Sequence, residues 1–192
     1  MAIQVERESI TTKSRHVSPS YVDKDGNQLL TSSDRPFPVI DVNHFRLHEG
    51  RAYYTYKQYP YVAGLAAGSS IDIAIAFPSG ITPHAIFSYG GSGEAEFYVY
   101  EAPTTSGGTS MTIHRRNRNL VTTSTGVSVL NPTVSALGTE IFAEFVPANK
   151  QGGGSESYTF EYVLKPLTTY LFRLTNVNAQ PHAANLTIEW YE

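Results

Sequence analysis

The chain has 192 residues, a formal net charge of −3 and no cysteine. This length suffices for one large β domain or two small domains, and the absence of cysteine excludes disulfide frameworks, thiolate zinc sites and cysteine nucleophiles. Only 16% of the residues are charged, whereas 15 are glycine and 13 are tyrosine, a balance typical of a β-rich chain with many turns. The small net charge gives no reason to expect nucleic acid or an anionic membrane as a partner, and no apolar run predicts a signal peptide or a membrane span.

Residues 1–40 differ from the rest, and we predict that they form an extended N-terminal arm. Residues 1–20 are polar without a sustained apolar period, and residues 23–27 read DKDGN, which favours a turn. The prolines of residues 35–38 exclude a helix. Two alternatives remain open: a flexible leader, or an arm that becomes ordered only on a partner. In the second case the anchors are Phe37, Val39 and Ile40.

Residues 41–192 show apolar side chains at every second position, the period of half-buried β-strands. Residues 51–57 carry aromatic side chains on both faces, among them Tyr53 and Tyr54, which indicates burial on both sides or one face that meets a neighbour. Further strands are predicted at residues 69–77, 84–89 and 94–100. In the first of these the inward side chains are Ile71, Ile73, Ile75 and Phe77, and in the last they are Ala95, Phe97 and Val99.

The middle of the chain gives weaker signals. Residues 103–109 predict a polar loop, and Met111 and Ile113 open a short strand that runs into the basic residues 114–119. Residues 127–134 and 139–146 predict two further strands. The second of these places Ile141, Ala143 and Phe145 on one face.

The last part of the chain has the clearest period. Three runs alternate, at residues 158–164, 170–175 and 185–191, and the short connection between the first two predicts a hairpin. No window shows a helical stripe and no repeat of fixed period appears. We therefore predict one all-β domain over residues 41–192, an antiparallel two-sheet sandwich of the jelly-roll type, behind the arm.

Three groups of side chains bear on chemistry. His44 and His48 are four residues apart, which on a strand is about 13 Å, too far for one metal ion, so we favour a structural or interfacial role. The cluster of Arg115, Arg116 and Arg118 beside His114 is the densest positive charge in the chain. Because no broad basic face surrounds this cluster, we expect it to lie in a solvated loop or to form ion pairs with an acidic protein, and we do not expect it to contact phosphates.

Among the acidic residues Glu94, Glu96 and Glu101, the first two share a strand face at a spacing close to that used for glycosidic cleavage. Exposed acids alternate on many strands, however, and no motif surrounds these. The chain has no nucleophile elbow, phosphate loop or dinucleotide fingerprint. We therefore predict no catalytic residue, no cofactor and no metal. The many tyrosines leave a second hypothesis, a sugar-binding surface of stacked rings.

Five segments are distinctive: VIDVNHFRLHEG at 39–50, EAPTTSGGT at 101–109, HRRNRN at 114–119, LKPLTTYLFRLTN at 164–176 and EWYE at 189–192. Together they resemble a family of tailed-bacteriophage virion proteins encoded among head genes. The resemblance runs from Val39 to the end of the chain and leaves the arm uncovered.

This resemblance implies a structural component of the virion, made in the host cytoplasm, namely a capsid decoration (cement) protein. Such a protein trimerises on the outer capsid surface and clamps neighbouring subunits of the major capsid protein. The residues that we expect to contact the partner are Phe37, Val39, Tyr53, Tyr54, Arg115, Arg116 and Arg118. The alternative is a module on a head fibre or tail that binds a host glycan.

Overall fold

The computed structural model describes residues 20–22, 28–30, 42–148, 154–157 and 161–192. The chain divides into two units, Met1–Asp41 and Val42–Glu192. In the first unit, β1 (Ser20–Val22) pairs antiparallel with β2 (Gln28–Leu30). The proposed anchors Phe37 and Val39 lie outside the described residues, and so does the predicted turn at 23–27.

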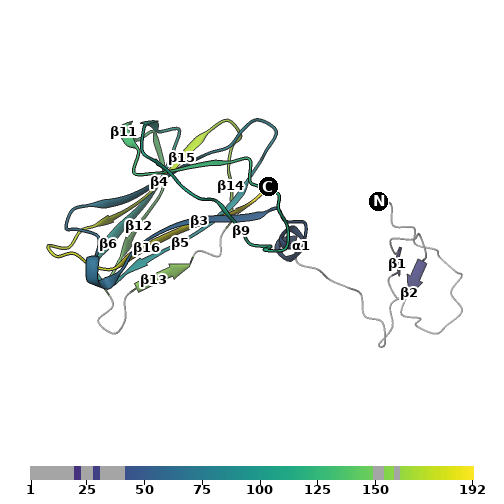
Figure 1. The fold of residues 1–192 in the computed structure, drawn as a ribbon, viewed down its shortest axis with the longest axis horizontal. Helices are drawn as coiled ribbons and strands as arrows, with labels where there is room; N and C mark the ends of the chain where they lie inside the picture. The colour runs from purple at the N-terminus through teal and green to yellow at the C-terminus, as the bar shows by residue number, and fades with distance from the viewer. Residues whose placement is uncertain (1–19, 23–27, 31–41, 149–153, 158–160) are drawn as a thin grey trace, which may run out of the picture. The chain divides into compact units, whose positions relative to one another are not determined.

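The second unit is an antiparallel β-sandwich with one short helix (Figure 1). In chain order its elements are α1 (Val42–His48), β3 (Ala52–Tyr59), the 3₁₀ turn η1 (Tyr61–Ala63), β4 (Ser70–Ala76), β5 (His84–Gly91), β6 (Ala95–Glu101), β7 (Thr104–Ser106), β8 (Thr109–Ser110), β9 (His114–Arg115), β10 (Val127–Leu130), β11 (Thr133–Ala136), β12 (Thr139–Val146), β13 (Gly154–Ser157), β14 (Tyr162–Val163), β15 (Thr169–Asn176) and β16 (Ala184–Tyr191). The predicted two-sheet sandwich is therefore confirmed.

The two sheets are named here after their first strands. The β3 sheet has the order β13-β5-β16-β3-β9, with β14 also paired to β5, and the β4 sheet has the order β12-β6-β15-β4-β10-β8. Early strands pair with late ones in nested order: β3 with β16, β4 with β15, β5 with β13 and β14, and β6 with β12. Most pairs therefore join residues that are far apart in the sequence, and the N-terminal and C-terminal halves cannot form separate sheets.

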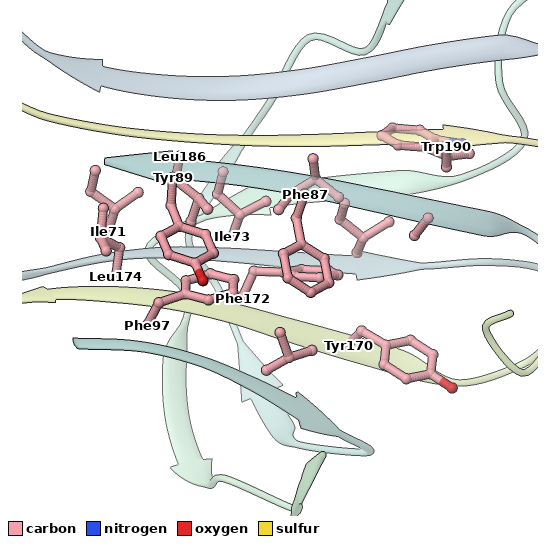
Figure 2. Close-up of a cluster of buried hydrophobic side chains, with 14 of the residues drawn as sticks. Ile71, Ile73, Phe87, Tyr89, Phe97, Tyr170, Phe172, Leu174, Leu186 and Trp190 are labelled. Atoms are coloured by element: carbon pink, nitrogen blue, oxygen red, sulfur yellow. The ribbon is translucent and has the colours of Figure 1, made fainter. Parts of the chain in front are cut away.

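The hydrophobic core fills the space between the two sheets. Ile73 and Phe172 enter it from the β4 sheet, and Phe87 and Leu186 enter it from the β3 sheet, all four at most 1% exposed. Figure 2 shows these side chains pointing into one layer between the strands. The inward side chains predicted at Ile71–Phe77 and Ala95–Val99 are confirmed. Apolar burial of this kind supplies the main driving force for folding.

The predicted hairpin between residues 158–164 and 170–175 is wrong. β14, at the end of the first run, pairs with β5 in the β3 sheet, whereas β15 pairs with β4 and β6 in the other sheet. The connection between them crosses from one sheet to the other and does not make a tight turn. The strands β15 and β16 themselves lie where the alternation predicts them.

The edge strand β12 shows a second difference from the prediction. Ile141, Ala143 and Phe145 do share one face, but that face points away from the core, and Ile141 and Phe145 are 37% and 53% exposed. The pairing with β6 shifts between Glu140 and Phe142, an irregularity of the bulge type, and such a shift turns the following side chains to the opposite face. The inward positions are taken by Phe142, which packs on the core, and by the fully buried Val146.

Shorter elements also depart from the predictions. No helix is expected from the sequence, yet α1 covers Val42–His48. The predicted loop at 103–109 contains β7 and begins β8, and the predicted strand at 127–134 is divided into β10 and β11. The break falls at Asn131, which has a positive φ of 47°, and at Pro132, which has no N–H to donate to a ladder.

Candidate binding site

The basic cluster lies beside the aromatic strand β3, because β9 is the edge strand of the β3 sheet. β9 pairs antiparallel with β3, so that Tyr53 lies opposite Arg115 and Tyr54 lies opposite His114 (Figure 1). The backbone N–H of Arg116 donates to the carbonyl of Ala52 at 2.9 Å. The pairing therefore brings four of the predicted contact residues, more than sixty positions apart in the sequence, into one place.

The outer face of this sheet carries a row of aromatic rings. The Tyr54 ring stacks on the His114 ring, with centroids 5.1 Å apart and planes 26° apart, and on the Tyr56 ring at 6.1 Å and 23°. Arg116 Nη1 lies 2.8 Å from a carboxylate oxygen of Glu189 on β16. Of these side chains, all but His114 border a cleft of about 380 Å³. Its lining residues are Tyr54, Tyr56, Arg115, Arg116, Arg118, Thr187 and Glu189.

The guanidinium of Arg115 lies beside the Tyr53 ring and is not part of the row of stacked rings on the outer face. Its carbon lies 6.0 Å from the centre of the Tyr53 ring, and the residue is only 8% exposed. Its Nε and Nη1 atoms are buried and have no hydrogen-bond partner. Buried donors without acceptors are costly, and these two nitrogens are the buried side-chain atoms without a partner among the described residues.

The segment after β9 forms a second cleft, of about 310 Å³, which shares Arg115 and Arg118 with the first. Its lining residues are Tyr53, Thr112, Ile113, His114, Arg115, Arg118, Leu120, Val121, Thr122, Thr123 and Ser124. Hydrogen bonds hold this segment at both ends. Asn117 Nδ2 donates to the carbonyl of His48 at 3.2 Å, and Ser124 Oγ and Thr125 Oγ1 donate to the carboxylate of Glu192 at 2.5 and 3.1 Å.

The predicted contact residues thus have different roles. Tyr54 and the exposed Arg118 face the clefts, Arg116 is paired with Glu189, and Arg115 is buried. Tyr53 is 4% exposed, with its ring 6.2 Å from that of Trp190, so it supports the site from inside.

Sequence reasoning missed Tyr56, Thr187 and Glu189 as members of the site. In the alternating run at residues 185–191, Thr187 and Glu189 stand between the apolar residues Leu186, Ile188 and Trp190, which puts them on the opposite face of the strand. The pairing of β16 with β3, which no local pattern reveals, was the missing information.

The two histidines of the N-terminal segment lie on the helix α1 and not on a strand. The strand geometry assumed for them is therefore wrong. His48 makes contacts of its own, and no group of three or more His, Asp or Glu side chains in the described parts of the chain is arranged to hold a metal ion.

The acidic residues of β6 are engaged with neighbours. Glu101 accepts hydrogen bonds from Lys165 Nζ at 2.7 Å and Tyr170 Oη at 3.0 Å, and Glu96 accepts one from Tyr98 Oη at 3.0 Å. The hydrogen bond from Lys165 lowers the pKa of Glu101 below its ordinary value, and the hydrogen bond from Tyr170 acts in the same direction. A general acid needs the opposite shift, so the environment of Glu101 keeps it ionised.

Comparison with known proteins finds no matching family model, no matching curated protein and no matching solved structure. Within the described residues, no helix is long and apolar enough to cross a membrane. The fold and the site therefore define this unit as an antiparallel β-sandwich with an arginine- and tyrosine-lined pair of clefts at one sheet edge.

Proposed function

We propose that this chain is a non-enzymatic structural protein of a phage virion, a capsid decoration protein. It binds the outside of the head as a homotrimer and stabilises neighbouring subunits of the major capsid protein. The observation that carries the proposal is the convergence of Tyr54, Arg115, Arg116 and Arg118 around two adjoining clefts. Aromatic side chains and arginine are the residue types enriched where proteins bind other proteins.

The strand order supports the same proposal. Nested pairing of early with late strands, combined with successive crossings between two sheets, is the connectivity expected of a jelly roll. We propose that fold type for this sandwich. The outer face of the β3 sheet, which carries the clefts, then remains available for partners. The outer face of the β4 sheet is partly covered, because Ala74, Tyr100 and Leu171 are buried there in a second apolar cluster.

The outward face of β12 provides a second contact surface. Ile141, Ala143 and Phe145 form an exposed apolar row on an edge strand whose free side faces no other strand of its sheet. Exposed apolar rows on sheet edges tend to pair with another chain. We assign this row to contacts between copies in the trimer, and the clefts to the capsid.

The experiment is a mass measurement of the full-length protein, alone and mixed with empty heads of the parent phage. A trimer that binds the heads at a saturating, symmetric number of sites supports the proposal. Three attachment points raise the overall affinity through effective concentration, so binding also depends on the intact trimer. A monomer that leaves the heads unbound at every concentration overturns it.

The alternative is a head-fibre or tail module that binds a host glycan. The row of rings formed by Tyr54, Tyr56 and His114 favours it, since rings of this kind stack on sugars. A glycan-array signal that disappears in both Tyr54→Ala and Tyr56→Ala, together with no binding to heads, would select this alternative.

A further inference from the structure

The cationic groups at the edge of the β3 sheet are not equally neutralised. Arg116 is paired with Glu189, and earlier in the chain Arg46 and Arg51 lie near Glu49. Neither Arg115 nor Arg118 forms an ion pair with any carboxylate among the described residues. Two arginines that line the same pair of clefts therefore have no counter-charge within the described part of the chain.

The burial of Arg115 makes this imbalance expensive. Only 8% of the surface of Arg115 is exposed, and its buried Nε and Nη1 atoms have no hydrogen-bond acceptor. The Tyr53 ring at 6.0 Å supplies a cation–π attraction, which is worth roughly 0.5–2 kcal/mol. A buried charge without a hydrogen-bonded partner costs more than that, so a negative group beside Arg115 would remove a penalty that the fold carries.

We infer that the two clefts form one carboxylate-binding site, in which Arg115 and Arg118 receive an acidic side chain from a protein partner. Both residues border both clefts, which have volumes of about 380 and 310 Å³. Arginine pairs with carboxylates through short, charge-assisted hydrogen bonds. This inference rests on the proposed function, because it names the chemistry by which the capsid surface is held.

The charge of the first cleft favours a single negative charge over a dianion. Its wall already contains the carboxylate of Glu189, which repels a second anion, and Arg116 is occupied by that carboxylate. The two remaining cations suit one carboxylate. A phosphate dianion would bring more negative charge next to Glu189 and lose part of the attraction.

The rim of the clefts favours a protein segment over a sugar. Leu120 and Val121 on the second cleft are 43% and 95% exposed. Aliphatic side chains at the mouth of a site bind other apolar side chains and offer a hydroxylated sugar no hydrogen bond. The partner sequence that fits is an acidic residue flanked by apolar residues.

The test is an NMR titration of the full chain, following the Nε–H signals of its arginines. The probe is the blocked tripeptide acetyl-Leu-Glu-Leu-amide, and its matched control is acetyl-Leu-Gln-Leu-amide. We expect saturable shifts of the Arg115 and Arg118 signals with the Glu peptide and affinity about tenfold weaker with the Gln peptide. Equal responses to the two peptides, or no saturable shift, would overturn the inference.

Two variants and two small anions complete the test. Arg118→Gln removes an exposed group without disturbing the core and is expected to weaken the Glu peptide about tenfold. Arg51→Gln, which removes the same charge outside the clefts, is expected to leave binding unchanged. An unchanged affinity in Arg118→Gln overturns the site. If glucuronate binds more tightly than the Glu peptide, the site takes a sugar acid and the inference of a protein partner is wrong. If inorganic phosphate binds more tightly than the Glu peptide, the preference for a singly charged anion is wrong.

The peptide titration tests the carboxylate site and the binding of empty heads tests the decoration function, so that either hypothesis can be rejected without the other. If the Glu peptide binds but the heads do not, the carboxylate site stands and the decoration function is wrong. If the heads bind the Arg118→Gln variant and the original protein equally well, the function stands and this site is not where the capsid is held.

Discussion

Arg173 on β15 donates from Nε and Nη2 to the two carboxylate oxygens of Asp72 on β4, at 2.7 and 2.6 Å. The two residues lie directly opposite each other, on the face of the β4 sheet away from the core. The hydrogen bond to Asp72 raises the pKa of Arg173 above its ordinary value. This geometry, in which a planar guanidinium meets both oxygens, is what Arg115 lacks at the edge of the other sheet.

Replacing Asp72 by alanine should destabilise the fold, because it leaves the largely buried Arg173 without an acceptor. We expect the free energy of unfolding to fall by about 2 kcal/mol, as for other hydrogen bonds to charged groups. Urea unfolding followed by tryptophan fluorescence at Trp190 measures it. Glu49→Ala is the matched control: it removes the exposed pairs with Arg46 and Arg51, which should change stability by less than about 0.5 kcal/mol. Equal losses in the two variants would contradict the prediction.

The Lys165–Glu101 contact predicts a pH dependence. The hydrogen bond from Lys165 lowers the pKa of Glu101 in the folded state below its ordinary value of 4.5. The stability contributed by the ionised carboxylate is therefore fully present above about that pH. It is lost as the pH falls through the lower pKa of the folded state. Lys165→Met should raise the pKa of Glu101 toward 4.5, measured by NMR titration of its carboxyl carbon, and should reduce the loss of stability below pH 4.5. A Glu101 titration that Lys165→Met does not alter would reject the assignment.

The outward face of β12 can be tested by paired substitutions. Phe142→Ala removes a ring packed against the core and should cost about 2–4 kcal/mol. Phe145→Ala removes a ring that is 53% exposed and should cost less than about 1 kcal/mol in the isolated chain. Thermal unfolding of dilute protein compares the two. If Phe145→Ala were the more destabilising change, the register of this strand would have to be shifted by one residue.

Gly138, between β11 and β12, has a φ of 81°. A Cβ atom there would lie 2.2 Å from the carbonyl oxygen of Glu101, so Gly138→Ala must displace backbone and should cost more than about 2 kcal/mol. Gly68 also has a positive φ, of 68°, but a Cβ atom there meets nothing within 4 Å. Gly68→Ala should therefore cost only about 1 kcal/mol. Calorimetric unfolding of both variants separates the clash from the conformational strain that they share.

The N-terminal segment gives a functional prediction. Deletion of residues 1–38 should abolish binding to empty heads and leave the trimer folded, because the sandwich is a separate unit that begins at Val42. Sedimentation of the truncated protein with and without heads measures both properties. Binding that survives the deletion would reject the role of the arm. In that case Phe37→Ala and Val39→Ala should also have no effect.

Alternation along the chain was sufficient to predict much of the sandwich. The inward faces of β4 and β6, and the positions of β15 and β16, follow from side chains that point to opposite sides in turn, which is a local property of an extended backbone. The short helix α1 and the brief strands β7 and β9 are too short to show a period of their own. The bulge in β12 depends on the partner strand β6 and has no signature in its own sequence.

The sequence by itself determined the β-rich class, the apolar layer that fills the core and the presence of three neighbouring arginines. Only the tertiary structure decided that β14 and β15 lie in opposite sheets, that Arg115 is buried against Tyr53, and that Glu189 neutralises Arg116 while Arg118 stays free of any ion pair within the described residues. The physical reason is the distance along the chain over which the determining interactions act. Alternation is set by each residue and its neighbours in the chain, whereas strand partners, burial and the balance of charge are set by contacts between segments that lie far apart in it.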